Sequence, residues 1–226
     1  MKKVVASIFS LAIILSLSHL AAAQTGSNAP NDQLIIAAGN GDTAAVQQLL
    51  ARGANIEARS GLGNTALITA AYWGRTDVVR LLLEKGANIE AKNNDQETAL
   101  ISVAEDGKTD VVKLLLEKGA NTEARDSYGQ TALIAAAANG KSGAVRLLLE
   151  KGARIEARGN SGETPLIAAA GDGYIEAVKL LLAKGANIEA RDNKGNTALK
   201  VAKLSAATYG TKTAEIVKLL KEKGAH

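Results

Sequence analysis

A threonine recurs every 33 residues along most of this chain, and this period constrains the fold more than any other feature of the sequence. The positions are Thr65, Thr98, Thr131, Thr164 and Thr197. They open the segments "TALITAA", "TALISVA", "TALIAAA", "TPLIAAA" and "TALKVAK", and each leads to a stretch such as "VVRLLLEKGA". A weaker copy begins at Asp32. A fixed period of this length is typical of repeat proteins, in which neighbouring units stack and bury their apolar faces together.

Each copy predicts two helices separated by a glycine. In the copy that begins at Thr65, the threonine can cap a short helix by accepting a hydrogen bond from a backbone N–H of its first turn. Gly74 ends this helix, because glycine readily adopts the left-handed backbone required there. A second helix starts near Thr76 and ends at Gly86. Its apolar residues cover too wide an arc for one buried stripe, so it must contact its partner helix and the copies on both sides.

This pattern resembles the ankyrin repeat. The resemblance is carried by the T-A/P-L opening, the two small residues after it, the mid-repeat glycine and the closing L-L-L-x-K-G-A. It implies an all-α solenoid of antiparallel helix pairs, with hairpin-like loops that project at an angle to them. The family often has histidine after T-P-L, whereas this chain has Ile68, Ile101, Ile134, Ile167 and Lys200. We expect the fold to tolerate this departure, although any hydrogen bond made by the histidine is lost.

Six copies divide the chain from residue 30 onward. We predict one repeat domain with units at 30–59, 60–92, 93–125, 126–158, 159–191 and 192–226, called here the first to the sixth copy. The outer two are interpreted as caps, because terminal faces have no neighbour and must be polar. Gln48 replaces a leucine in the first copy, and Lys200, Lys203 and Lys221 replace apolar residues in the sixth. We therefore expect a complete array. Six extra residues in the sixth copy predict an extended first helix or a loop.

Residues 1–23 have the features of a bacterial-type secretory signal. Lys2 and Lys3 give a positive start, "VVASIFSLAIILSLSHL" is an apolar run, and "AAA" supplies the small residues of a cleavage site. An uncleaved membrane anchor is the alternative interpretation. We predict a cleaved signal peptide, a linker over 24–29, and an exported protein, periplasmic or secreted, with no membrane span after cleavage.

The net charge and the absence of cysteine argue against several kinds of partner and against disulfide bonds. Loss of the two signal lysines leaves 25 basic residues (27 − 2) against 23 acidic ones, so the net charge falls from +4 to +2. A charge this small gives no support for binding to nucleic acid or to an anionic membrane. The chain has no cysteine. Its stability must therefore come from packing rather than from disulfides.

The usual catalytic patterns are missing from the sequence. There is no thiol nucleophile, and His226 is the only histidine beyond the signal, so neither a Ser–His–Asp arrangement nor a cluster of soft metal ligands can form. "GDGYIEA" and "GNGDTAA" lack the phosphate-binding pattern and fall at inter-helix turns. We predict no enzyme activity, no cofactor and no metal. A hydrolase that uses grouped carboxylates stays open as an alternative, because acidic residues are plentiful.

A glutamate precedes a basic residue by two positions in five copies. The pairs are Glu57 with Arg59, Glu90 with Lys92, Glu123 with Arg125, Glu156 with Arg158, and Glu189 with Arg191. In extended backbone, residues two apart share a face, so stacking predicts a glutamate row beside a basic row. We interpret the rows as an exposed structural ladder, in which each pair contributes at most about 1 kcal/mol. A calcium site is the alternative.

Comparison of the copies with one another separates scaffold from surface. Positions that stay the same hold the stack, and positions that change are free for another role. The changing positions flank the hairpin tips and close the first helix of each copy, and in ankyrin-like proteins these positions line the concave binding surface. The candidate protein-binding residues are Leu62, Tyr72, Trp73, Asp95, Glu97, Glu105, Asp106, Tyr128, Asn139, Glu163 and Asp172.

Aromatic residues are scarce, and their positions favour binding. Beyond the signal there are five, none at a repeated core position: Tyr72, Trp73, Tyr128, Tyr174 and Tyr209. Exposed tyrosine and tryptophan dominate binding hot spots, where each contributes about 2 kcal/mol or more. We therefore predict Tyr72 and Trp73 as apolar anchors. The alternative is that they only cover the edge of the apolar groove.

The candidate positions also carry six acidic residues and no basic one. A negative face repels nucleic acid and favours a protein partner with a basic patch. Ordinary solubilising charge is the alternative. Together these features predict a monomeric, non-catalytic protein–protein interaction module of the cell envelope, acting as an inhibitor or protector of its partner. The alternatives left open are the carboxylate-dependent hydrolase and a purely architectural spacer.

Overall fold

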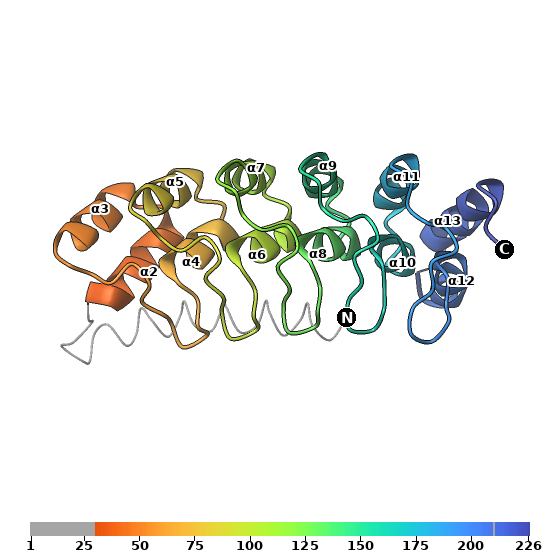
Figure 1. Cartoon of the computed structure of the whole chain (residues 1–226), viewed down its shortest axis with the longest axis horizontal. Helices are drawn as coiled ribbons and strands as arrows, with labels where there is room; N and C mark the ends of the chain where they lie inside the picture. The colour runs from red at the N-terminus through yellow and green to blue at the C-terminus, as the bar shows by residue number, and fades with distance from the viewer. Residues whose placement is uncertain (1–29, 210) are drawn as a thin grey trace.

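The computed structural model describes residues 30–209 and 211–226, and this part of the chain is a single row of paired helices (Figure 1). The predicted signal peptide (1–23) and linker (24–29) lie outside the described residues. The helices are α2 (Pro30–Asn40), α3 (Thr43–Ala51), α4 (Ala66–Tyr72), α5 (Thr76–Glu84), α6 (Ala99–Asp106), α7 (Thr109–Glu117), α8 (Ala132–Ala138), α9 (Ser142–Glu150), α10 (Pro165–Gly171), α11 (Ile175–Ala183), α12 (Ala198–Tyr209) and α13 (Thr211–Glu222). Within the described residues there is no strand. The predicted all-α repeat architecture is confirmed.

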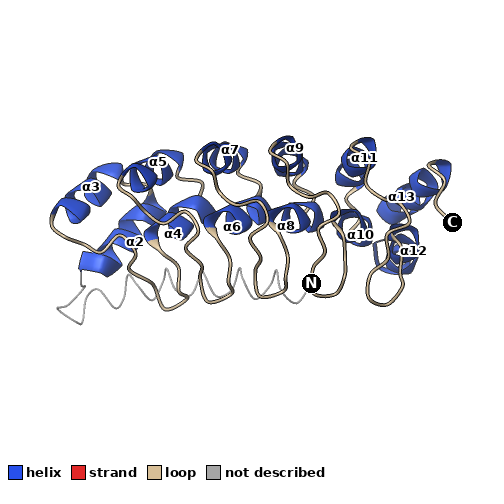
Figure 2. Ribbon diagram, in the orientation of Figure 1, coloured by secondary structure: helices blue, strands red, loops and turns tan. Residues whose placement is uncertain are grey.

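The helices form two layers. The first helices of successive copies pack side by side in one layer, and the second helices form the other, as Figure 2 shows. Long loops join the second helix of one copy to the first helix of the next, and they project together to one side of the row. None of the helices in this part of the chain combines the length and apolar character needed to cross a membrane.

The recurring threonines cap the first helices as predicted. The Oγ1 atom of Thr65 accepts a hydrogen bond from the Ile68 backbone N–H at 3.3 Å, and Thr98 does the same for Ile101 at 3.4 Å. The first helix of the second copy ends at Tyr72. Gly74 follows with a φ of 69°, in the left-handed region where glycine is favoured. The 33-residue period is therefore the spacing of helix N-caps.

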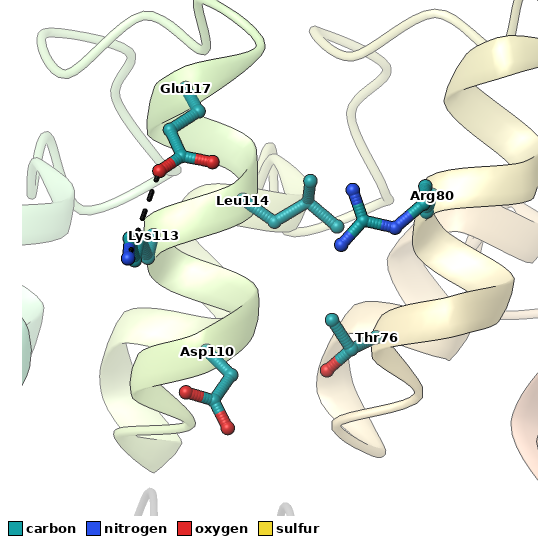
Figure 3. A pocket seen from close by; sticks show the side chains of 6 residues that line it. All are labelled: Thr76, Arg80, Asp110, Lys113, Leu114 and Glu117. Carbon is teal, nitrogen blue, oxygen red and sulfur yellow. Dashed lines mark ion pairs between the residues drawn. The ribbon is translucent and has the colours of Figure 1, made fainter.

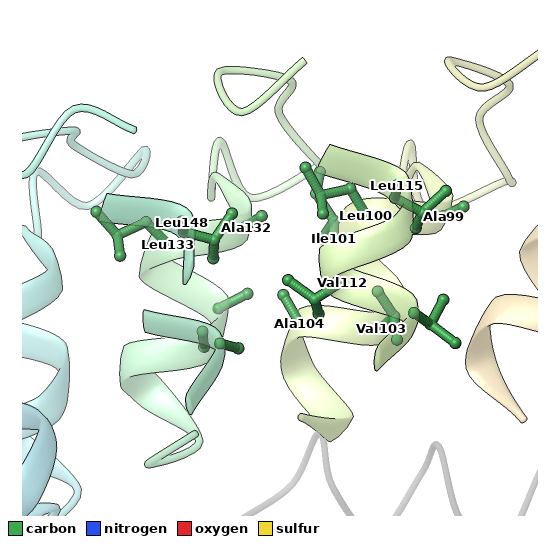
Figure 4. Close-up of a cluster of buried hydrophobic side chains, with 14 of the residues drawn as sticks. Ala99, Leu100, Ile101, Val103, Ala104, Val112, Leu115, Ala132, Leu133 and Leu148 are labelled. Atoms are coloured by element: carbon green, nitrogen blue, oxygen red, sulfur yellow. The ribbon is translucent and has the colours of Figure 1, made fainter. Parts of the chain in front are cut away.

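The core is aliphatic and runs without interruption from copy to copy. Figure 4 shows Leu100 and Leu115 of the third copy at the same level as Leu133 and Leu148 of the fourth, all of them buried. No described aromatic side chain belongs to this core. Because each unit contributes the same small set of residues, the stack can extend without large rings inside.

The isoleucines that replace the family's histidine are part of this packing. Ile68, Ile101, Ile134 and Ile167 are all buried. Ile134 packs against Ala157 in the following loop and against Ala168 on α10 of the next copy. In the sixth copy, which has no following unit, the equivalent Lys200 is exposed. An apolar side chain therefore fills this buried position in the four inner copies, and the fold forms without the histidine.

The polar replacements in the two terminal copies are exposed, and the insertion is helical. Gln48, Lys203 and Lys221 are exposed, as expected for terminal faces. The six extra residues lengthen both helices of the sixth copy. Helix α12 has 12 residues where α4, α8 and α10 have 7, and α13 has 12 where α11 has 9. Of the two predicted forms of the insertion, the extended helix is therefore observed.

The predicted structural ladder exists, but its bonds differ from those expected. Each glutamate accepts a hydrogen bond from a backbone N–H of the next copy. The Oε1 atoms of Glu57, Glu90, Glu123, Glu156 and Glu189 bind the N–H groups of Asn88, Asn121, Arg154, Asn187 and His226 at 2.7, 2.8, 2.9, 2.7 and 3.0 Å. The glutamates lie at turns rather than in extended strands, so the expected pairing with the basic residue two positions later is wrong.

The basic residues of the ladder also bind backbone of the next copy. Lys92 Nζ donates to the Arg125 carbonyl at 2.9 Å, and Arg125 donates to the Arg158 carbonyl at 2.7 Å. Arg59 and Arg158 make the equivalent bonds. Among the described residues, no three Asp, Glu, His or Cys side chains are grouped to hold a metal ion. The ladder ties the copies together along the base of the loops.

Candidate functional site

The stack brings the candidate residues into two adjacent rows. One row, called here the inner-helix row, lies at the ends of the first helices and consists of Tyr72, Trp73, Glu105, Asp106, Asn139 and Asp172. The other lies on the projecting loops and consists of Leu62, Asp95, Glu97, Tyr128 and Glu163. Residues far apart in sequence are neighbours because each copy places them at the same position.

Backbone hydrogen bonds hold the hairpin tips against one another. The Asn94 N–H donates to the Leu62 carbonyl at 3.1 Å, and the Ser127 N–H donates to the Asp95 carbonyl at 2.8 Å. The Asn160 N–H donates to the Tyr128 carbonyl at 2.9 Å. Side chains at the tips stay exposed, with Tyr128 at 49%. The tips therefore form one continuous ridge beside the inner-helix row.

Tyr72 and Trp73 form an edge-to-face pair with ring centroids 5.4 Å apart and an interplanar angle of 87°. Both side chains are half-buried rather than fully exposed. Trp73 leans toward the first copy, where a Cβ atom added to Gly39 would lie 3.4 Å from the indole Cδ1. The prediction that the described aromatics avoid the core is confirmed, and the side chain of Tyr209 lies outside the described residues. The pair is held in place by packing, so it presents a fixed apolar surface.

The charged groups that act electrostatically on Tyr72 belong to the third copy. Burial raises the pKa of the Tyr72 phenol, and the carboxylates of Asp106 and Glu105 raise it further. Glu97 acts in the same direction, whereas the Lys108 ammonium lowers it. The aromatic pair of the second copy and the acids of the third are therefore close enough to interact electrostatically.

Lys108 is a part of this site that comparison of the variable positions missed. Its Nζ lies 2.9 Å from Asp106 Oδ2. Lys108 belongs to a basic row formed with Arg75 and Lys141, the residues that follow the mid-repeat glycines. Each stem covers the glycine of the preceding copy; a Cβ on Gly74 would lie 3.3 Å from Lys108 Cγ. The sequence did contain a sign of this row, because Arg75, Lys108 and Lys141 are spaced by 33 residues. In the third copy, the row places a cation beside the acid at the end of the first helix.

Some candidate residues have structural partners. Glu97 accepts a hydrogen bond from Asn93 Nδ2 at 3.0 Å, within its own loop. Glu163 accepts one from Gln130 Nε2 of the preceding copy at 2.9 Å. Asn139 Nδ2 donates to the Ala135 carbonyl at 2.9 Å. These three side chains help to fix the loops and helix ends that carry the surface.

Asp172 lies in an unfavourable environment for a charge. Burial raises the pKa of its carboxyl, and the nearby Glu163 raises it further. The folded state therefore holds a proton on Asp172 at a pH where the unfolded chain has released it. Its contribution to stability falls as the pH rises above the ordinary value of 3.8. Perturbed carboxyls of this kind are common at functional sites.

Asp172→Asn is expected to raise the free energy of unfolding at pH 7, because the amide carries no charge to desolvate or to repel Glu163. Urea unfolding of the variant and the unaltered protein, compared from pH 3 to pH 7, measures the difference. It should grow as the pH rises above 3.8. In a Glu163→Gln background the gain should be smaller. A constant difference across this range would contradict the assigned cause.

An open groove of 360 Å³ lies in the other layer, between the second helices α5 and α7 (Figure 3). Its lining residues are Thr76, Arg80, Asp110, Lys113, Leu114 and Glu117. Arg80 extends from α5 toward Leu114. The Nζ atom of Lys113 lies 4.0 Å from Oε1 of Glu117 on the same helix. None of the candidate residues lines this groove.

Comparison with known proteins agrees with the repeat pattern. A family model described as ankyrin repeats matches the chain three times, over residues 10–93, 89–159 and 154–226. No curated protein matches the chain. The three matches together include every residue that the structure describes.

Proposed function

The chain belongs to the ankyrin-repeat family, whose members are generally protein–protein interaction modules, and on that basis we propose that it captures a protein partner on its inner-helix row and hairpin tips. Within this proposal the protein performs no catalysis. Tyr72 and Trp73 are the apolar anchors, and Glu105 and Asp106 orient the partner. In this proposal the inner-helix row corresponds to the concave binding face that the family resemblance implies.

The observation that carries this proposal is the position of the aromatic pair. Tyr72 and Trp73 stand where the next copies have Glu105 and Asp106 or Ala138 and Asn139, so the repeat itself does not require rings there. Both are half-buried and fixed edge to face. Rigid aromatic side chains that lose little conformational freedom on binding are the usual anchors of interfaces.

The charge pattern supports a partner with a basic patch. The third copy carries Asp95, Glu97, Glu105 and Asp106 on the two rows, beside the anchors. Opposite charge at an interface speeds association and selects among partners. The same acids disfavour nucleic acid. We propose that the protein acts as a monomer on a protein target.

The place of action in this proposal is the cell envelope. A secretory signal at residues 1–23 would export the chain to the periplasm or beyond the cell. There the protein would inhibit or protect its partner. This part of the proposal is supported by the sequence pattern of residues 1–23.

Affinity purification with paired baits tests the binding proposal. Tyr72→Ala together with Trp73→Ala should abolish retention of the partner, because each anchor contributes about 2 kcal/mol, or roughly 30-fold in affinity. Far-UV circular dichroism and a melting curve establish that the double variant still folds. The matched control is Leu204→Ala, which removes an apolar side chain, 64% exposed, at the position equivalent to Tyr72 in the sixth copy. This control should retain the partner.

Identical retention by the unaltered bait, the double variant and the control would count against the anchors and in favour of an architectural spacer. The hydrolase alternative assigns catalysis to grouped carboxylates, such as Glu105 and Asp106. Replacement of both Glu105 and Asp106 by alanine distinguishes the hydrolase alternative from the binding proposal. A binding module should then hold its partner more weakly, whereas a carboxylate-dependent hydrolase that uses these acids should lose turnover.

A further inference from the structure

A cationic side chain of the protein itself, Lys108, is paired with one of the acids beside the aromatic pair. The Lys108 ammonium lies 2.9 Å from the Asp106 carboxylate. It is also close enough to the Tyr72 phenol to oppose the effect of the carboxylates on its pKa. The chain thus shows by its own folding that this position accepts a cationic side chain.

The ion pair is specific to the third copy. The two positions it uses are occupied by Trp73 and Arg75 in the second copy, by Asn139 and Lys141 in the fourth, and by Asp172 and Tyr174 in the fifth. Only in the third copy does an acid at the helix end stand two residues before a base. Since the pair is not part of the repeat, the stack does not depend on it.

The ion pair is also easily broken. The Asp106 side chain is 40% exposed and that of Lys108 49% exposed. Exposed pairs of this kind contribute little, because water screens them and long side chains lose freedom when held. The stem of Lys108 is anchored over Gly74, so the ammonium can leave Asp106 without moving the helix.

From these observations we propose that an arginine side chain of the protein partner binds between Asp106 and the Tyr72 ring, and that it must displace Lys108 to do so. This inference rests on the proposed function, and it specifies the chemistry of the site. Lys108 acts as a competitor built into the chain. It lowers the affinity for any cationic segment that cannot replace its contact with Asp106.

Arginine fits this position better than lysine. A guanidinium can give a carboxylate two parallel hydrogen bonds, whereas an ammonium gives a single point contact of the kind Lys108 already makes. Its flat face also stacks on an aromatic ring, and Tyr72 is held edge to face against Trp73. Only a ligand with these advantages displaces a lysine that is already attached to the protein.

Hexa-arginine and hexa-lysine peptides are suitable probes, and Trp73 is the reporter because it is the only tryptophan in the sequence. Titration of the protein with hexa-arginine should change the Trp73 fluorescence at lower concentration than hexa-lysine does. Lys108→Met keeps the stem over Gly74 but removes the ammonium, and should tighten hexa-arginine binding roughly three- to fivefold. Asp106→Asn should weaken it roughly tenfold or more.

The matched control is Lys141→Met. It removes the same charge at the same position of the next copy, where Asn139 stands in place of the acid. If Lys108→Met and Lys141→Met tighten binding equally, the effect is general electrostatics and the inference is overturned. No change on Lys108→Met, or equal affinity for the two peptides, overturns it as well.

The outcome for this inference can be told apart from the outcome for the proposed function. If the natural partner still depends on Tyr72 and Trp73 but is indifferent to Lys108→Met, the inference fails and the binding proposal stands. If the partner is retained without the anchors, the binding proposal fails. Circular dichroism of Lys108→Met and Lys141→Met ensures that each variant is compared in the folded state.

Discussion

Replacement of Ile134 by lysine is expected to destabilise the protein by about 4 kcal/mol or more, because it places an ammonium where no water and no partner reach it. Ile134 is 0% exposed and lies between Ala157 and Ala168, at the contact with the next copy. A loss of this size is a large fraction of the stability of a typical domain. Urea unfolding followed by circular dichroism measures it.

Two comparisons make this result specific. Lysine already occupies the equivalent position in the sixth copy, so Lys200→Ile should change the free energy of unfolding little, since that side chain is exposed. The buried lysine should also have a lowered pKa, so the folded state releases its proton before the unfolded state does. The Ile134→Lys variant should therefore regain stability as the pH rises toward 10. A variant as stable as the unaltered protein at pH 7 would contradict this account of the interface.

The fold could be predicted because the same physical problem is solved in every copy. Thr65 and its equivalents at 33-residue intervals cap helices, and Gly74 and Gly86 end them with left-handed backbone. A single copy would be weak evidence for this arrangement. Five in register leave one stacked arrangement that buries the aliphatic residues, since each unit needs its neighbours to cover its apolar faces.

The ladder of glutamates and basic residues shows that a pattern of side chains does not always predict their hydrogen-bond partners. The pairing of Glu57 with Arg59 assumed an extended backbone, but Glu57 lies at a turn. Its true partner is the backbone N–H of Asn88, 31 residues away. Backbone donors have no signature in the sequence, so a prediction that pairs side chains with side chains overlooks them. The repeated spacing was correct, and only the type of bond was not.

The site was predicted in outline but not in its charge balance. Comparison of the copies separated positions that vary from positions that repeat, and Lys108 belongs to a repeated basic row. Lys108 was therefore not among the candidate residues, although its neighbour Asp106 was. An acid stands at the Asp106 position in one other inner copy, as Asp172 of the fifth. The functional meaning of Lys108 depends on that neighbour, which only the folded structure places 2.9 Å away.

Leu148→Ala is expected to destabilise the fourth copy more than the second. It tests whether the candidate site stays folded when another part of the array is weakened. Leu148 on α9 is 0% exposed and belongs to the continuous core. Loss of a fully buried leucine costs about 2–5 kcal/mol, according to how far the surroundings close the cavity. The matched control is Leu147→Ala, which removes a half-buried leucine from the same helix and should cost less.

Two probes report on different parts of this variant. Circular dichroism follows the helices of all copies, whereas Trp73 fluorescence follows the second copy alone. Because each copy contacts only its neighbours, a defect in the fourth should lower the midpoint of the circular dichroism transition more than that of the Trp73 transition. Coincident transitions shifted by the full amount would mean that the stack unfolds as one cooperative unit. Separate transitions would mean that the second and third copies, which carry the aromatic pair and its acids, stay folded independently of the far end.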